Sequence, residues 1–187
     1  MFDYFIKRFD LFVLMLFVNT SFAGNNIEET GEVVQVLEPL AGFAIAVAKK
    51  DTEGVKQISK TVAMNYVATK VLKRTLNNVR INGKRIGEGP QNLTYNFPSG
   101  HTSTAFAGTW CLHKRYGYSV LPLLGAAFVG YSTVHSNFHD WEDVVGGAIT
   151  GIASASLFTR KMNDDKTSIA SNYNGHRGAS LTLNMQL

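Results

Sequence analysis

The sequence contains a single cysteine, Cys111, among its 187 residues. With only one thiol, the chain cannot form an intrachain disulfide, even in an oxidising compartment. Charged residues are also scarce, at 17%, whereas hydrophobic residues make up 45%. The basic residues do not gather into a stripe interleaved with aromatic side chains, so we expect no nucleic-acid binding. The formal net charge of +4 instead suits an anionic substrate or a membrane surface.

The first 23 residues have the pattern of an export signal. Lys7 and Arg8 precede an apolar run from Leu11 to Val18, and Ser21-Phe22-Ala23 places small residues where a signal peptidase recognises them. An uncleaved membrane anchor is the competing interpretation, because acidic residues lie in the same segment. We therefore divide the chain into a signal or anchor over 1–23, a helical domain over 24–162 and a C-terminal segment over 163–187.

Over most of the chain the apolar residues recur with helical spacing. Asp51 has the character of an N-cap, and Val55, Ile58 and Val62 follow it on one helical face. Residues 24–36 are polar and are expected to form a surface lead-in, and the apolar run that follows is too short to span a bilayer. The pattern predicts an all-α bundle of about five to six helices. The helical segments are expected near residues 37–48, 51–81, 99–116, 119–134 and 140–161.

Small residues recur along the last of these segments. Gly147, Gly151 and Ala155 are four residues apart, so they share one helical face. Such a face lets a second helix backbone approach closely.

Strand spacing is confined to the C-terminus. Leu181, Leu183, Met185 and Leu187 alternate with polar residues there. This alternation predicts a short edge strand or a ribbon that touches a membrane. Residues 163–178 before it are expected to form a loop.

The segment Pro98-Ser99-Gly100-His101 has the character of a ligand-binding helix start. Proline fixes the entry to the helix, Ser99 can cap it, and Gly100 lets a ligand approach the backbone. The free N–H groups of a first helical turn attract anions. His101 in that turn can donate a proton to a leaving oxygen when its pKa is near the working pH. The alternative is an ordinary helix start with a solvated histidine.

His139 and Asp143 form a second polar cluster. They are four residues apart, so on a helix the carboxylate can orient the imidazole and leave its other nitrogen free as a nucleophile. Ser132 precedes them at the end of an apolar segment. Without catalysis, acidic residues here would simply cap a helix and occupy its first turn.

Lys73 and Arg80 make a third element. They are seven residues apart, and on one continuous helix both cations would project from the same face. A lysine and an arginine together can clamp a phosphate group. The alternative is a solvated basic face, since other basic residues lie nearby.

In order and spacing, these three elements resemble the phosphatidic acid phosphatase type 2 superfamily, which also contains class A acid phosphatases and vanadium haloperoxidases. The pattern of that family is a lysine, six residues and arginine-proline, then proline-serine-glycine-histidine, then serine-arginine, five residues, a histidine, three residues and an aspartate. Residues 73–80, 98–101 and 132–143 keep these three spacings.

The resemblance implies a metal-independent phosphatase that needs no cofactor. By this resemblance, His139 attacks phosphorus to form a phosphohistidine, Asp143 orients His139, and His101 protonates the leaving group. It also implies that the phosphoryl oxygens are held by Lys73, Arg80, Ser99, Gly100 and Ser132. The substrate is expected to be a phosphomonoester or diphosphate, on a lipid, hydrolysed outside the cytoplasm by a periplasmic or membrane-associated enzyme.

Two positions depart from the family pattern. Ile81 stands where the family has proline, and Thr133 stands where it has arginine. The second departure removes a phosphate ligand, and such a loss costs on the order of 2 to 4 kcal/mol of transition-state binding. Arg74, Lys84 and Arg85 are candidates to supply the missing charge.

Three alternative functions remain open from the sequence. One is a soluble, broad-specificity periplasmic acid phosphatase. Another is a metal site, because His135, His139 and Asp143 recur every four residues and would share a face of one helix. The third is a protein that binds phosphate without hydrolysing it, because Thr133 replaces the expected arginine. The small size of the chain disfavours a haloperoxidase.

Overall fold

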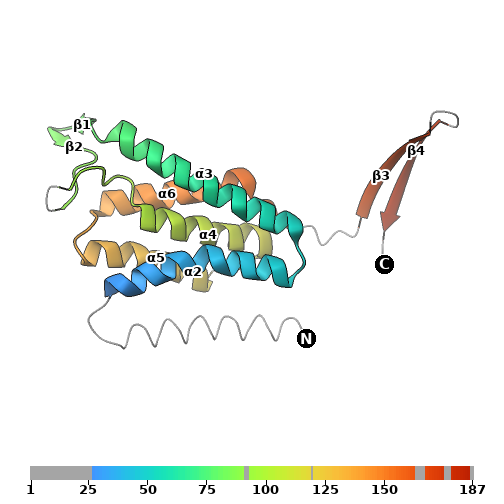
Figure 1. The fold of residues 1–187 in the computed structure, drawn as a ribbon, viewed down its shortest axis with the longest axis horizontal. Helices are drawn as coiled ribbons and strands as arrows, with labels where there is room; N and C mark the ends of the chain where they lie inside the picture. Colours follow the sequence, from blue (N-terminus) through green and yellow to red (C-terminus); the bar gives the residue numbers. More distant parts are fainter. Residues whose placement is uncertain (1–26, 91–92, 119, 163–166, 175–177, 186–187) are drawn as a thin grey trace.

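A computed structural model describes residues 27–90, 93–118, 120–162, 167–174 and 178–185. Figure 1 shows its helices lying side by side along the long axis of the molecule. Helix α4 is central and packs against the other described helices. The all-α bundle predicted from the sequence is confirmed. The described helices are α2 (Ile27–Ala48), α3 (Thr52–Leu76), α4 (Gly100–Tyr116), α5 (Val120–His135) and α6 (Trp141–Phe158).

Helix α2 is longer than the sequence predicted. It begins at Ile27, so the expected polar lead-in is helical, with Glu28 and Glu29 in the first turn, where acidic side chains are favourable. Thr30 and Val34 are buried against the bundle, and this packing extends the helix beyond its apolar run. By length and composition, α2 could cross a membrane.

Helix α3 is shorter than predicted. It ends at Leu76, and a two-stranded hairpin of β1 (Arg80–Ile81) and β2 (Lys84–Arg85) follows. Asn82 and Gly83 connect the strands with φ angles of 52° and 86°. An Asn-Gly pair favours this turn, in which both central residues have positive φ. Lys73 and Arg80 therefore do not share a helical face, and that expectation was wrong.

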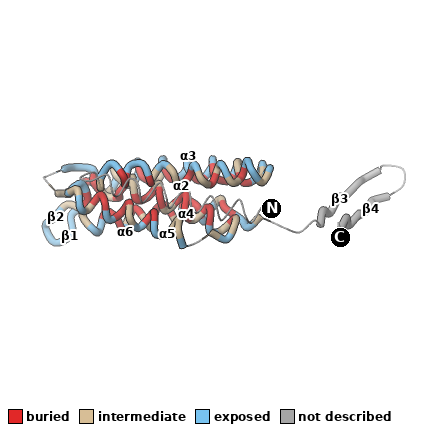
Figure 2. Tube along the Cα trace, turned by 90° about the horizontal axis from the view of Figure 1, so that it is seen from below, coloured by how far each residue is buried: buried red, intermediate tan, exposed pale blue. Residues whose placement is uncertain are grey.

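The interior of the bundle is built from small side chains, and Figure 2 shows the buried residues on the inward faces of the helices. One cluster joins Val34, Ala105, Ala126 and Val129. A second, nearer the other end of α4, joins Ala46, Ile58, Cys111 and Ala155. Burial raises the pKa of the Cys111 thiol, which keeps it protonated and unreactive.

Helices α4 and α6 touch through their backbones. A Cβ atom added at Gly147 would lie 2.6 Å from the Ser99 carbonyl oxygen, and one at Gly151 would lie 2.3 Å from the Ser103 carbonyl oxygen. Ala155 continues this face and is fully buried. The close approach predicted from the spacing of small residues is confirmed, and it places the start of α4 directly against α6.

A buried polar network closes the end of the bundle opposite the hairpin. Asp51 caps α3 by accepting a hydrogen bond from the Gly54 N–H, as the sequence predicted. The same carboxylate pairs with the Arg115 guanidinium and accepts a hydrogen bond from Tyr116. Arg115 also donates to Gln57. These bonds tie α3 to the end of α4.

The C-terminal segment contains two strands. β3 (Thr167–Asn174) pairs antiparallel with β4 (Gly178–Met185), with Ile169 opposite Leu183. The predicted strand is the second half of this hairpin, whereas the loop expected over 163–178 contains β3. A strand needs a partner for its backbone N–H and C=O groups, and the alternation near Leu181 did not identify one. The predicted export signal over 1–23 lies outside the described residues and stays a prediction.

Candidate active site

The site is assembled at the end of the bundle where α4 and α6 begin and α3 and α5 end. Ser99 is fully buried and caps α4, its Oγ accepting a hydrogen bond from the Thr102 N–H at 3.3 Å. Its own N–H donates to the Asp143 carbonyl at 2.9 Å. Around Gly100, a Cβ atom would contact only Thr69, at 3.9 Å. The first turn of α4 thus leaves room for a ligand, as expected for this motif.

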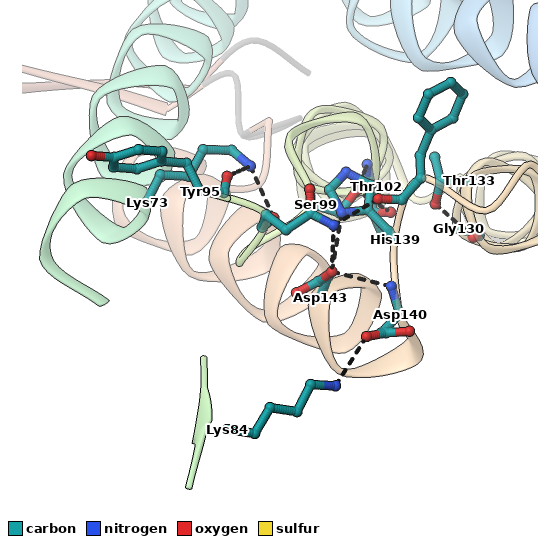
Figure 3. A network of polar contacts seen from close by, with 12 residues as sticks. Lys73, Lys84, Tyr95, Ser99, Thr102, Gly130, Thr133, His139, Asp140 and Asp143 are labelled. Carbon is teal, nitrogen blue, oxygen red and sulfur yellow. Dashed lines mark hydrogen bonds and ion pairs between the residues drawn. The ribbon is translucent and has the colours of Figure 1, made fainter. Parts of the chain in front are cut away.

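His139 is oriented by Asp143. Figure 3 shows the contact between the two side chains. His139 Nδ1 lies 3.2 Å from Asp143 Oδ2, and both side chains are buried. The His139 backbone N–H donates to the Thr133 carbonyl at the end of α5. Asp143 Oδ2 also accepts the Asp140 backbone N–H at 3.1 Å, which completes a capping box at the start of α6. Asp143 therefore both completes the capping box of α6 and holds the His139 imidazole.

The two histidines of the motifs face each other. The ring centroids of His101 and His139 are 6.4 Å apart, with an interplanar angle of 67°. His101 Nδ1 is buried and has no hydrogen-bond partner among the described residues. Burial lowers the pKa of His101, and the nearby His139 and Lys73 lower it further, whereas Glu32 raises it. The pair can supply a nucleophilic nitrogen and a proton donor to one small ligand between them.

Lys73 adds a positive charge to the same place. Its ammonium donates to the backbone carbonyls of Tyr95 at 2.8 Å and Asn96 at 2.9 Å. Burial lowers the pKa of Lys73 to about 8, with Lys70 contributing in the same direction and Asp143 opposing it. An ammonium has three donors, so one remains for a ligand.

Two cavities adjoin His101. The larger, of about 370 Å³, is lined by His101, His139, Lys73 and Gly100 together with residues of α2, α3 and α4. The smaller, of about 120 Å³, is lined by His101, Ser132 and Thr133, with Glu28 and Glu32 from α2. The structure thus brings together the predicted site residues at positions 73, 99, 100, 101, 132, 139 and 143.

Arg80 does not join them in this structure. It is exposed, its guanidinium donates to the Gly83 carbonyl at 3.0 Å, and it lines neither cavity. Its role in phosphate binding stays a prediction.

The arginine missing at position 133 is not replaced at this site by the expected neighbours. Thr133 is buried and donates to the Gly130 carbonyl. Figure 3 shows Lys84 paired with Asp140. The two lie 3.2 Å apart, and Arg85 lies 3.5 Å from Glu88. Neither basic side chain lines the cavities beside His101, and neither does Arg74.

The alternative metal site does not form in the described part of the chain. His135 ends α5, His139 lies in the following turn, and Asp143 lies in α6, so the three do not share one helix. The His135 ring is exposed and lies against Tyr131, at a centroid distance of 5.7 Å. Among the described residues, no group of three or more His, Cys, Asp or Glu side chains could hold a metal ion.

Three residues of the site were not predicted from the sequence. Asn96 donates to Asp143 Oδ2 at 3.3 Å and to the Phe138 carbonyl at 2.6 Å. Lys70 lines the larger cavity, and Glu32 lines the smaller one. For Asn96 the available signal was its place just before the Phe97-Pro98 pair. For Glu32 there was none, because the packing of α2 beside Ser132 cannot be read from local sequence.

The chain is similar to several known proteins. The family model described as the PAP2 superfamily matches residues 55–166. Lipid A 1-phosphatase of Helicobacter pylori strain J99 is 28% identical over 138 residues, covering 72% of this chain and 71% of that protein. Lipid phosphate phosphatase 2 of Arabidopsis thaliana is 40% identical over 77 residues, covering 33% of this chain and 27% of its own. Lipid A 1-phosphatase of Porphyromonas gingivalis is 42% identical over 66 residues, covering 33% and 15%. No solved structure matches the chain significantly.

Proposed function

The chain belongs to the PAP2 superfamily and is a phosphatase, and from this membership we propose that it removes phosphate from a lipid through a phosphohistidine formed on His139. One observation carries the proposal. The His139–Asp143 pair faces His101 across 6.4 Å, on the wall of a cavity that also contains Lys73. This is the arrangement that transfer of a phosphoryl group from an alcohol to an imidazole requires.

The first chemical step forms the phosphoenzyme. Asp143 accepts the Nδ1–H of His139, so Nε2 carries the lone pair that attacks phosphorus. The bond between phosphorus and the leaving oxygen breaks, and that oxygen takes a proton from His101. The Lys73 ammonium and the free N–H groups at the start of α4 stabilise the negative charge on the phosphoryl oxygens.

The second step releases phosphate. Water attacks the phosphohistidine, and neutral His101 accepts a proton from it. The bond between phosphorus and Nε2 breaks, which regenerates His139 and liberates inorganic phosphate. No step needs a metal ion, so we propose that the enzyme is metal-independent and keeps its full rate in a chelator.

A lipid substrate is supported by the relatives and by the surface of the bundle. The named relatives are phosphatases of lipid A or of lipid phosphates. Four of the described helices expose large apolar side chains, which mark membrane contacts when they are numerous. We therefore propose an exported enzyme that works at a membrane, with its site on the periplasmic side. Among these side chains are Val36 and Leu40 of α2, Val67 and Val71 of α3, Leu124 of α5, and Val145 and Ile149 of α6.

The proposal is tested by phosphate release from a short-chain lipid phosphate in detergent micelles. His139→Ala and His101→Ala should each lower kcat by about 10³-fold or more. His113→Ala is the matched control, because this exposed histidine lies in the last turn of α4, away from the site. Circular dichroism and thermal unfolding should show that all three variants are folded.

The covalent intermediate is tested separately. Rapid alkaline quenching of wild type with ³²P-labelled substrate should give a base-stable phosphoprotein that loses its label on later acid treatment, and His139→Ala should give none. Retained turnover in folded His139→Ala would refute the mechanism. Normal phosphate binding without any phosphoenzyme in the wild type would instead indicate a non-catalytic binding protein. Recovery of the protein in the cytoplasmic fraction, with none in the periplasmic or membrane fractions, would contradict the proposed location.

A further inference from the structure

The larger cavity extends well beyond the catalytic histidines. It follows one face of α3 away from Lys73 and is also lined by Gln35 of α2 and Ala107 of α4. Its volume of about 370 Å³ exceeds what a single phosphate group needs. The residues along this face of α3 would therefore contact the part of the substrate that lies beyond the phosphate group.

Six residues of α3 line the cavity, Asn65 and Thr69 among them, and the other four form a series along the helix. Val62, Tyr66, Lys70 and Lys73 recur at intervals of four, four and three residues, which keeps them on one helical face. At 1.5 Å of rise per residue, Lys70 is about 4.5 Å from Lys73 along the axis, and Val62 is about 16 Å from it. From the catalytic end outwards, this series presents two cations, an aromatic ring and an apolar side chain, and the buried Asn65 and Thr69 add polar groups to the same wall.

Lys70 is exposed and lies near an aromatic ring rather than an acid. Its ammonium lies over the Tyr66 ring, 5.5 Å from the centroid. In the described part of the chain Lys70 forms no ion pair, whereas Lys84 and Arg85 each have an acidic partner. Two neighbouring cations on one cavity wall repel each other, and a ligand with more than one negative charge relieves that repulsion.

We propose that Lys70 is a specificity-determining residue that binds a second anionic group of the substrate, about one helical turn from the phosphate that is removed. The apolar part of the substrate then follows the wall past Tyr66 and Val62. This inference rests on the proposed function and adds the class of substrate, an apolar molecule with a second negative charge next to the scissile phosphate. That charge can belong to the inner phosphate of a diphosphate ester or to a separate carboxylate.

The test compares three synthetic substrates in the same detergent micelles. They are dodecyl phosphate, dodecyl diphosphate, and a dodecyl phosphate with a carboxylate on the carbon next to the ester. Lys70→Met should lower kcat/KM about 10- to 100-fold for one or both doubly anionic substrates, the size expected when a hydrogen bond to a charged group is lost. It should leave dodecyl phosphate within about twofold. The arm that loses activity identifies whether the second anion is a phosphate or a carboxylate.

Arg74→Met is the matched control, since this exposed cation lies on the same helix outside the cavity. Equal losses on all three substrates would overturn the proposal and make Lys70 a ligand of the scissile phosphate itself. No loss on any of them would make it an ordinary surface lysine. If the wild type releases phosphate from none of the three substrates, the proposed function itself fails. This result is distinct from the two outcomes for Lys70→Met.

A binding measurement supports the test without turnover. In folded His139→Ala, inorganic diphosphate should bind more tightly than inorganic phosphate, and Lys70→Met in that background should remove the difference. Unchanged preference for diphosphate in the double variant would also overturn the proposal.

Discussion

Asn96 Nδ2 lies 3.3 Å from Oδ2 of Asp143, and the same oxygen lies 3.2 Å from Nδ1 of His139. Asn96 also donates to the Phe138 carbonyl at 2.6 Å, just before His139. One amide therefore holds both the carboxylate that orients the imidazole and the backbone that carries it. Groups of this kind do not touch the substrate but fix the geometry of those that do.

Asn96→Ala is expected to lower kcat about 10- to 100-fold with little change in KM, because the imidazole loses its fixed orientation. Steady-state kinetics on a lipid phosphate measure both constants. Asn78→Ala, an exposed asparagine close to the end of α3, should have no effect. If the loss follows only the fraction of unfolded protein, Asn96 is structural and not a positioning residue.

The pH profile of kcat/KM should steepen above about pH 8. Proton donation requires charged His101, whose lowered pKa gives a first decline on the alkaline side. Lys73, with a pKa lowered to about 8 by burial, loses its charge as pH rises through that value and adds a second decline. Lys73→Arg keeps its charge and should remove only the second decline. A wild-type profile with a single slope up to pH 9.5 would contradict this role for Lys73.

Glu32→Gln should shift the first alkaline decline to lower pH. The Glu32 carboxylate raises the pKa of His101, so its removal lowers that pKa further. Because Glu32 is exposed, we expect a loss of up to about fivefold in kcat/KM at pH 7. The loss should be smaller with p-nitrophenyl phosphate, whose leaving group needs less protonation. Glu53→Gln is the control, because Glu53 lies in the first turn of α3, at the end of the bundle away from the site. An equal shift in that variant would show that the change does not come from the Glu32 carboxylate acting on His101.

Arg115→Met should destabilise the protein without changing the chemistry. It leaves the buried Asp51 carboxylate without its ion pair, which costs about 3–5 kcal/mol in the free energy of unfolding. Urea unfolding followed by circular dichroism measures this change, with Arg160→Met as the exposed control. The rate per folded molecule should stay the same, because the network lies at the opposite end of the bundle. A loss below about 1 kcal/mol would show that the pair adds little.

Local sequence predicted the parts of the site that depend on adjacent residues. The caps at Asp51 and Ser99 are where the sequence placed them. The spacing from His139 to Asp143 brought the carboxylate to the imidazole across the start of α6, although His139 itself precedes the helix. In each case the contact joins residues three or four positions apart, so the motif contains the geometry.

The parts that were missed depend on contacts between distant segments. The start of α2 is helical because Val34 packs on α4 and α5, and this packing is what brings Glu32 to the second cavity. Arg80 lies outside α3, although the sequence predicted that it would be helical. The turn preference of Asn82-Gly83 outweighed the helical spacing of the apolar residues before it. Lys70 was not identified as a site residue, since nothing in its local sequence indicates that a cavity lies beside it.

The contact of α6 with the first turn of α4 at Gly147 limits which parts of the site can be substituted. Main-chain atoms that already touch cannot move closer, so we expect the start of α4, which carries His101, to keep a fixed position against α6. Farther from the two histidines, the larger cavity is lined by residues of α2 and α3 and by Ala107 of α4, and the α2 and α3 side chains can be exchanged without altering the contact between α4 and α6. Substitutions meant to change the substrate preference should therefore begin on α2 and α3 and leave the backbone contact between α4 and α6 intact.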